Sequence, residues 1–504
     1  MMPKQKFFWD RLMLGLALGY LLLPFIIFCC GWLRWPLAAG GCLLLGVGVY
    51  RMWADLTPSL RPEMLTRRQW GWGVGILLLL AVWCFFSGIG GFSFQNYDHL
   101  YRNAIFRDLI NLDWPVRYGV RDGAGQVTSY RMSYYIGFWL PAALVGKYEG
   151  EAVAQVVLLL WTIGGCGLTV YYLHRLCPRL PAAVMALLLI FWSGMDVVGG
   201  WIVSPSQGWS DWEKHLENWN YNAQYSCFTT ALYWVFNQAL PSWLAVALIL
   251  NFRTHHSSIY LLLALLAFFA PLPFIGFIPI VLFLTYEDLL KSKTGAAPYS
   301  LGRRLAERTR QCFSVPNLVG GVLLAVTLAF FSRSHAEQHF HLPAPVDWKW
   351  DHYGWFIVCE FGLLAAVMGW HYRRRPLFYL TVLLLLLYPA IYYGPTYEFG
   401  MRASLPALLV LLVFTADFLA DRNSSRWRRA VLIGLLAVGV VTPVHEIWRS
   451  MKHTAQYYSG KSDRLRLDQL GSLNDVLASA NNFITENRGV FSEYLMRRPV
   501  PPNP

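Results

Sequence analysis

The sequence predicts an all-α integral membrane protein with about thirteen transmembrane helices. Hydrophobic residues make up 56% of the 504 residues and aromatic residues 16%, while only 14% are charged. Many apolar runs approach the roughly 20 residues that a helix needs to cross a bilayer. Helix is expected in these runs because lipid offers no hydrogen-bond partner to free backbone groups. A soluble protein is excluded, since its surface would need many more polar residues.

The basic charge of the chain indicates topology. The formal net charge is +13, but the arginines gather in short segments between apolar runs, which is the positive-inside pattern of cytoplasmic loops. We therefore expect no nucleic-acid partner and place the N-terminus in the cytoplasm. The four clusters are Arg51, Arg61, Arg67 and Arg68; Arg303, Arg304, Arg308 and Arg310; Arg373, Arg374 and Arg375; and Arg422, Arg426, Arg428 and Arg429.

The first three spans are expected near 12–33, 35–53 and 70–91, which brings residue 92 to the extracytoplasmic side. The next apolar piece, 134–145, has only about twelve residues and contains a proline, so it suits an interfacial or re-entrant helix. If it crossed the membrane, the basic end of the span at 151–174 would lie outside, against the positive-inside rule. The remaining spans are expected near 181–203, 228–250, a proline-broken hairpin at 258–286, 316–332, 354–370, 376–393, 403–420 and 428–443.

This map divides the chain into three parts. Residues 1–69 form a membrane hairpin with a basic cytoplasmic loop, residues 70–443 form the main transmembrane domain, and residues 444–504 form an extracytoplasmic tail. The tail has mixed charge and an amphipathic stretch around Leu465–Ile484.

The extracytoplasmic loops at 92–151, 204–225 and 332–353 concentrate charged and aromatic residues, as does a short loop at 394–402. The second loop contains Asp211, Lys214, His215 and Glu217 among tryptophans. Polar and aromatic residues gathered on one face indicate a site that works outside the membrane, although aromatic residues at an interface also form ordinary belts.

The first loop predicts a helix that begins at Asp98. Apolar residues recur at helical spacing through residues 100–110, which defines one buried face. His99, Arg102, Asn103 and Arg107 fall on the opposite face, so the helix is expected to lie on the bilayer surface with this face in water. Asp98 is a favoured residue type for capping such a helix.

The same loop resembles that of a known superfamily. The residues that carry the resemblance are Asp98, Tyr101, Arg102 and the Trp114-Pro115 step, followed by Tyr134-Tyr135, Trp139-Leu140-Pro141 and a span closing at His174-Arg175. Over residues 90–200 this order is similar to the first extracytoplasmic loop of GT-C glycosyltransferases, such as protein O-mannosyltransferases and aminoarabinose transferases. Two spans precede the one that feeds the loop, where one is usual in these families, and their Pro-Pro step is absent.

The resemblance implies an inverting transfer of a sugar from a polyprenyl-phosphate-linked donor to a hydroxyl acceptor on a glycan, lipid or protein. It implies that Asp98 is the general base, on the outer face of a bacterial inner (plasma) membrane, in synthesis of a cell-envelope glycan or glycolipid. The leaving phosphate needs cationic partners. The expected substrate contacts are Tyr97, His99, Arg102, Arg107, Asp196, Asp211, Lys214, Glu398 and Arg402.

Two acids lie in apolar context. Asp196 and Glu360 both fall within expected spans, where a carboxylate is unfavourable and marks a cavity, a proton path or a partner. We expect Asp196 to line the site, while Glu360 equally suits a structural pair.

No metal site is expected. His335, His339, His341, Asp347, Asp351 and His352 match no ligand spacing, and none of the nine cysteines forms a CxxC pair. The sequence leaves room for a divalent cation beside Asp98 or Asp211.

Two alternatives remain open at this level: a transporter or flippase of lipid-linked saccharides, and a polymerase or ligase that joins them. Transporters of this size usually contain repeated halves, and no internal repeat is visible here.

Overall fold

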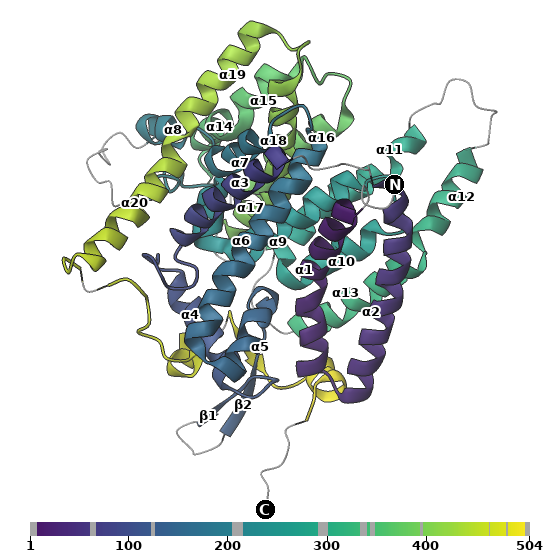
Figure 1. Ribbon diagram of the computed structural model, residues 1–504, viewed down its shortest axis with the longest axis vertical. Coiled ribbons are helices and arrows are strands. Elements are labelled where there is room, and N and C mark those ends of the chain that lie inside the picture. The colour runs from purple at the N-terminus through teal and green to yellow at the C-terminus, as the bar shows by residue number, and fades with distance from the viewer. Residues whose placement is uncertain are drawn as a thin grey trace, which may run out of the picture.

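The computed structural model describes residues 8–60, 67–121, 127–203, 215–290, 301–332, 340–342, 348–393, 397–462, 464–479 and 482–498. Helices make up most of this part of the chain (Figure 1). They are α1 Phe8–Trp32, α2 Trp35–Leu56, α3 Arg67–Phe85, α4 His99–Asn111, α5 Leu140–Glu149, α6 Glu151–Leu176, α7 Ala182–Phe191, α8 Asp196–Val203, α9 Phe228–Asn251, α10 Ile259–Phe269, α11 Pro271–Leu290, α12 Leu301–Cys312, α13 Val315–Phe331, α14 Trp350–Ile357, α15 Leu363–Gly369, α16 Pro376–Leu387, α17 Glu398–Ala403, α18 Leu405–Ala420, α19 Arg426–Gly439 and α20 Val441–Tyr458.

Long apolar helices make this an α-helical, membrane-embedded protein. Within the described residues, seven helical stretches are long and apolar enough to cross a membrane, or eight if the bent pair α12–α13 counts as one span. Five shorter apolar helices account for the other expected spans. The number thirteen therefore stays a prediction. The seven long stretches are Trp9–Trp32, Trp35–Ser59, Glu151–Leu176, Ala182–Val203, Phe228–Asn251, Trp350–Gly369 and Arg426–Tyr458.

Helix α9 forms the centre of the bundle. It is apolar around almost its whole circumference, and 94% of its most hydrophobic window is buried against α6, α7, α10 and α18. A helix that is apolar on all sides has to be covered on all sides. Its regular geometry is broken at Val235, which has φ −134° and ψ 35°. The position of this break matters for the candidate site.

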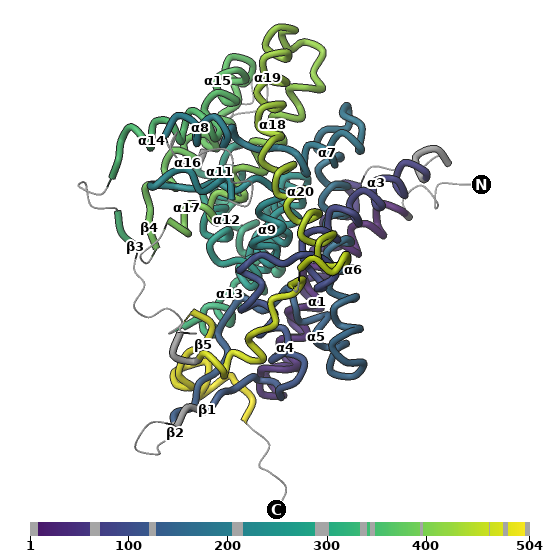
Figure 2. The backbone as a smooth tube through the Cα atoms, turned by 90° about the vertical axis from the view of Figure 1, so that its left-hand side faces the viewer, coloured from purple at the N-terminus to yellow at the C-terminus, as the bar shows by residue number. Residues whose placement is uncertain are grey.

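Two small sheets accompany the helices, which the all-α prediction did not include. Strands β1 Arg117–Arg121, β2 Val127–Met132 and β5 Ile484–Glu486 form an antiparallel sheet in the order β1-β2-β5. Strands β3 Phe340–His341 and β4 Tyr392–Tyr393 pair with each other. Strands of two to six residues are too short to show a clear alternation in sequence. Figure 2 shows β3, β4 and α14 on the side of the molecule opposite the N-terminus.

The last span continues beyond its expected end. The sequence ended it at residue 443, but the helical stretch runs on through α20 to Tyr458, so the boundary at 444 falls inside a helix. Residues of the expected tail, among them His445, Glu446 and Ser450, are buried on one face of α20. Polar residues continue the helix here because the protein supplies their partners.

The amphipathic stretch Leu465–Ile484 is not an α-helix. Residues 464–479 and 482–496, here called the C-terminal strap, run back over α4 with one 3₁₀ segment, Leu473–Ser479, and strand β5 (Figure 1). Their polar groups bond to α4 and its approach: the Gln95 backbone N–H donates to the Leu465 carbonyl, and Asp108 accepts the Leu473 N–H. The strap reaches the end of α1, where Leu33 pairs with Met496.

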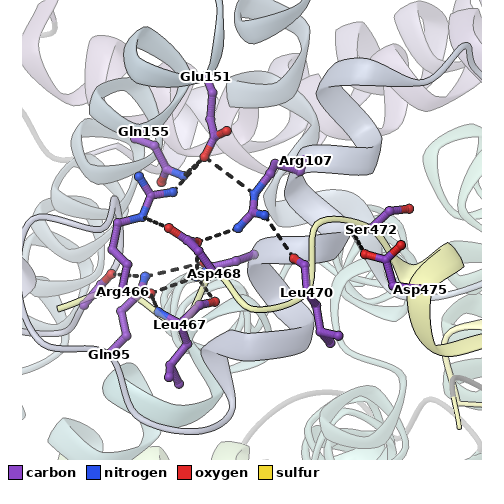
Figure 3. Close-up of polar contacts among 12 residues, drawn as sticks. Gln95, Arg107, Glu151, Gln155, Arg466, Leu467, Asp468, Leu470, Ser472 and Asp475 are labelled. Carbon is purple, nitrogen blue, oxygen red and sulfur yellow. Dashed lines mark hydrogen bonds and ion pairs between the residues drawn. The ribbon is translucent and has the colours of Figure 1, made fainter. Parts of the chain in front are cut away.

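Four alternating charges fasten the strap (Figure 3). The Asp468 carboxylate lies 2.5 Å from the Arg107 guanidinium and 3.1 Å from that of Arg466. Arg466 also lies 2.7 Å from Glu151, the first residue of α6, and Arg107 lies 3.8 Å from it. The strap is thus tied to both α4 and α6.

Helix α5 matches the expectation for the apolar piece at 134–145. It has ten residues and begins with a proline near its first turn, so it is too short to cross a bilayer.

Candidate functional site

The break in α9 presents backbone acceptors to the first loop. The Tyr233 carbonyl accepts a hydrogen bond of 2.6 Å from the Asn96 amide and lies 3.3 Å from His99 Nε2. The Trp234 carbonyl accepts a hydrogen bond from the Arg102 guanidinium. Where a helix is broken, nearby carbonyl groups lose their N–H donors within the helix. They need donors from other parts of the protein, because an unpaired buried carbonyl is destabilising. The loop is therefore fixed by the centre of the bundle.

The predicted wet face of α4 is wrong. His99, Arg102 and Asn103 are buried, with 2%, 5% and 7% of their surface exposed. His99 and Arg102 bond to α9, and Asn103 donates to Gln95 and to the Leu467 carbonyl of the strap. The sequence pattern correctly divides α4 into an apolar and a polar face. It does not indicate that α9 and the strap cover the polar face. The polar face of α4 is therefore covered by protein and not by water.

Asp98 is the accessible end of a partly buried ion pair. Its Oδ2 accepts a hydrogen bond of 2.9 Å from Arg102 Nη2, and 38% of the Asp98 side chain is exposed against 6% of Arg102. Asp98 precedes α4 in the capping position, yet its side chain makes no capping hydrogen bond. The capping interpretation is therefore not supported, and the carboxylate points to the arginine.

Arg402 forms a second ion pair, with Glu398. Its Nη1 donates to the Tyr135 hydroxyl at 2.7 Å, and its Nη2 lies 3.1 Å from Glu398, one helical turn earlier. Burial alone would lower the pKa of Arg402, but Glu398, the Tyr135 and Tyr134 hydroxyls and Asp98 together raise it above its ordinary value. The contribution of Asp98 is the smallest of these.

Tyr134 packs against Tyr135, the hydroxyl partner of Arg402. Burial raises the pKa of Tyr134 far above its ordinary value, whereas the charges of Arg102 and Arg402 act to lower it. Its ring lies 3.7 Å from that of Tyr135, centroid to centroid. We call Asp98, Arg102, Tyr134, Tyr135, Glu398 and Arg402 the Asp98 site.

A close helix contact positions Arg402. A Cβ atom on Gly276 of α11 would collide with the backbone carbonyl of Ala403, the last residue of α17. Only glycine allows the two backbones to approach this closely. The Tyr388 hydroxyl also donates to the Gly276 carbonyl at 2.5 Å. Helix α17, and with it Arg402, is therefore held against α11.

A second polar group surrounds the Trp234 side chain, here called the His215 group: His215, Glu217, Trp234, Glu446 and Arg449. His215 Nδ1 lies 2.7 Å from Glu446, and its Nε2 lies 3.6 Å from Glu217. The Trp234 indole donates to Glu446 at 3.3 Å, and Arg449 lies 2.8 Å from the same carboxylate. Because the Trp234 carbonyl binds Arg102, the two groups adjoin each other.

The His215 group holds shifted protonation equilibria. The pKa of Glu217 is raised to about 7, because burial, together with the Asp196 charge, outweighs the lowering effect of His215. Burial lowers the pKa of His215, but the Glu446 carboxylate outweighs this effect and the net shift is upward. The pKa values of the histidine and of one of its two glutamate neighbours are thus both shifted upward.

Asp196 and Glu360 meet where two spans depart from regular α-helix. Asp196 accepts hydrogen bonds from Ser193, Trp219 and Thr442 at 3.1, 3.2 and 2.8 Å, and Glu360 hydrogen bonds with it. Asp196 follows the break between α7 and α8, and Glu360 lies in a π-helical turn, Val358–Gly362, while Thr442 belongs to the continuous helical stretch Arg426–Tyr458. Such turns recur at functional sites.

The other predicted residues lie elsewhere. Arg107 forms an ion pair with Asp468 of the C-terminal strap (Figure 3), and Tyr97 is exposed. His99 contacts the Tyr233 carbonyl beside the break in α9. Asp211, Lys214, His335, His339 and Asp347 lie outside the described residues. Within the described part of the chain, no group of three or more His, Cys, Asp or Glu could hold a metal ion.

Sequence reasoning missed the roles of Trp234, Glu446 and Arg449. Glu446 and Arg449 are spaced i, i+3, which indicates a continuing helix, but they were read as the start of a tail. Nothing in the sequence indicated that α9 would break beside Trp234.

No family model, curated protein or solved structure matches this chain.

Proposed function

We propose that this protein is a membrane glycosyltransferase of the GT-C type, which moves a sugar from a polyprenyl-phosphate-linked donor to a hydroxyl acceptor. The proposal rests on the resemblance of residues 90–200 and on the grouping of Asp98 with Arg102 and Arg402. It places the reaction on the extracytoplasmic face of a bacterial plasma membrane, in the synthesis of a cell-envelope glycan or glycolipid.

One observation supports the proposal: an accessible carboxylate is paired with the buried Arg102, and its charge contributes to the raised pKa of a second buried guanidinium, Arg402, from a distant part of the chain. A transfer from a phosphate needs a base for the incoming hydroxyl and fixed cations for the departing charge. Asp98 offers the first, and Arg102 and Arg402 offer the second. Both arginines are held in place by carbonyl, hydroxyl or carboxylate partners.

The reaction follows from these positions. The acceptor hydroxyl oxygen attacks the anomeric carbon while the bond from that carbon to the phosphate oxygen breaks, which inverts the configuration. The hydroxyl proton passes to Asp98 as the hydroxyl becomes acidic in the transition state. The phosphate leaves on its polyprenyl chain and its added negative charge lies against Arg102 and Arg402.

The test is Asp98→Asn in a bacterial strain that lacks the native gene, with the surface glycans analysed. We expect loss of one glycan at unchanged protein level in the membrane, because the amide cannot accept the proton. The matched control is Glu149→Gln, which removes one exposed negative charge at the end of α5. If Asp98→Asn is present in the membrane and all glycans persist, Asp98 is not the base.

Asp196 and Glu360 favour a second candidate, a proton-coupled transporter of lipid-linked saccharides. Paired carboxylates at broken spans are typical of transport sites. A transporter would lose function on Glu360→Gln and keep it on Asp98→Asn. The glycosyltransferase proposal expects the opposite order of sensitivity.

A further inference from the structure

Helix α12 is short and strongly basic. Its twelve residues, Leu301–Cys312, contain Arg303, Arg304, Arg308 and Arg310 against a single acid, Glu307. A segment of this charge is strongly disfavoured in the hydrocarbon core of a membrane. Helix α12 therefore belongs at or above the membrane surface, although it leads directly into an apolar helix.

The connection to α13 fixes where that surface lies. The axes of α12 and α13 meet at 57° across Phe313 and Ser314. Ser314 caps α13 and donates to the Ser257 carbonyl, and Ser257 in turn donates to Asp55 at the end of α2. The bend is thus anchored at the end of the bundle where α2 finishes. Figure 1 shows α12 at the edge of the molecule, leading away from α13.

The other face of α12 is apolar and uncovered. On a helical wheel, Leu305, Ala306, Thr309 and Phe313 share one arc, while Arg303, Glu307 and Arg310 share the opposite arc. Leu305 is 46% exposed and Phe313 is 67% exposed. An amphipathic helix with an open apolar face and a basic face is the arrangement that binds at a bilayer interface.

The uncovered face continues into the lipid-facing surface of α13. Val315, Leu318 and Val322, which follow the bend, are exposed as well. If a second copy of the chain or a soluble protein covered α12, the exposed apolar side chains of α13 would still face lipid. The continuous apolar strip would then be covered by protein on α12 and by lipid on α13. Acyl chains cover both parts at once, and the arginines then lie at the level of the headgroups.

We propose that α12 is a binding element for anionic phospholipid headgroups. Its apolar arc lies among the upper acyl chains, and Arg303, Arg304 and Arg310 contact headgroup phosphates. The net positive charge of the helix attracts the negatively charged headgroups of anionic lipids. Zwitterionic headgroups carry no net charge and are not attracted in this way. This inference is independent of the proposed glycosyltransferase activity.

The test is a lipid titration of the purified full-length protein in detergent, followed by native mass spectrometry. The lipids are phosphatidylglycerol and phosphatidylcholine of the same chain length. The triple variant R303Q/R304Q/R310Q should bind phosphatidylglycerol about fivefold more weakly per arginine removed, the fold-change that corresponds to about 1 kcal/mol for each charge near a membrane surface. Phosphatidylcholine binding should not change.

The matched control is R373Q/R374Q/R375Q, which removes the same charge from the exposed turn between α15 and α16. It should keep wild-type phosphatidylglycerol binding. A further variant, Leu305→Glu, keeps all arginines but should weaken binding, because the apolar arc can no longer enter the bilayer. Thermal unfolding without added lipid shows whether each variant is folded.

Three outcomes would overturn the proposal. The α12 variant could bind phosphatidylglycerol as the wild type does, or both triple variants could lose binding equally. Displacement of the lipid by excess inorganic phosphate would show that the helix binds free phosphate and not a membrane lipid.

Discussion

At the residue scale, two buried groups next to the Asp98 site have pKa values that are shifted in opposite directions. Burial and the Arg102 guanidinium lower the pKa of His99 to about 3, so this histidine is neutral in the folded protein at pH 7. Burial raises the pKa of Glu217 from 4.5 to about 7. Each shift makes stability depend on pH, because the unfolded chain titrates at the ordinary values.

The signs of the two effects differ. Between pH 6.5 and pH 3 the unfolded chain protonates its histidine and the folded protein does not, so His99 destabilises the fold as the pH falls. Between pH 4.5 and pH 7 the unfolded chain releases the Glu217 proton and the folded protein keeps it, so Glu217 destabilises the fold as the pH rises. Each slope is at most about 1.4 kcal/mol per pH unit.

We therefore expect two variants to tilt the stability profile in opposite directions. His99→Gln should lose less stability than the wild type from pH 6.5 to pH 4, and Glu217→Gln should lose less from pH 4.5 to pH 7. Thermal unfolding of the purified protein in detergent at a series of pH values measures both. Profiles that run parallel to the wild type would show that neither group titrates as described.

Individual site residues were only partly predictable from the sequence. Asp98, Arg102, Glu398 and Arg402 are predicted by residue type and expected side of the membrane, and the structure pairs Asp98 with Arg102 and Glu398 with Arg402. Arg107 met the same criteria and lies in the strap cluster instead. A sequence pattern shows that a cation needs a partner but not which of several carboxylates supplies it.

At the element scale, the long apolar helices were predictable because their length and composition are sufficient. The exposure of α4 was not, since its neighbours α9 and the C-terminal strap are more than 120 residues away in sequence. The break at Val235 was not predictable either, because no glycine marks it and the first proline in the helix, Pro241, lies six residues further along. Tertiary packing decides both features.

The close contact between α11 and α17 gives a prediction at this scale. Gly276→Ala should lower the stability by about 1–3 kcal/mol or more, because the new methyl group would collide with backbone and force the helices apart. Arg402 would move with α17, so the variant should also lose function. Thermal unfolding in detergent and the surface-glycan assay measure the two effects.

The control for this prediction is Gly434→Ala in α19, where a Cβ atom meets nothing within 4 Å. This variant should keep or slightly increase stability, because alanine favours helix over glycine. Equal behaviour of the two variants would mean that α11 and α17 are not in tight contact.

At the scale of the whole molecule, the C-terminal strap packs against the transmembrane domain, which the sequence analysis treats as a separate part of the chain. A mixed-charge segment without regular periodicity was expected to be a free tail. Its ordered course depends on partners in α4, α6 and β2, and no local pattern specifies those. The coarse membrane architecture was therefore predictable, and the packing of its outer segments was not.

The strap is expected to depend on buried amides more than on its ion pairs. Gln95 is 3% exposed, donates to the Gly88 carbonyl at 2.9 Å and accepts the Leu467 N–H at 3.0 Å. Gln95→Ala should lower the stability by about 1–3 kcal/mol, since it leaves buried groups unpaired. Arg466→Gln, at a partly exposed ion pair, should change it by no more than about 1 kcal/mol.

Thermal unfolding and limited proteolysis of the strap measure this difference. Gln95→Ala should release a C-terminal fragment faster than Arg466→Gln does. The reverse order would show that the charged cluster, and not the amide, fastens the strap.

The strap also sets an order of events during synthesis. Arg107 and Asp468 are 361 residues apart, and chains are made at about 5–20 residues per second. Helix α4 therefore leaves the ribosome roughly 20–70 s before the segment that covers its polar face. During that interval Asn103 and Arg107 lack their partners in the strap, the Leu467 carbonyl and the Asp468 carboxylate. Completion of this end of the molecule thus waits for the last tenth of the chain.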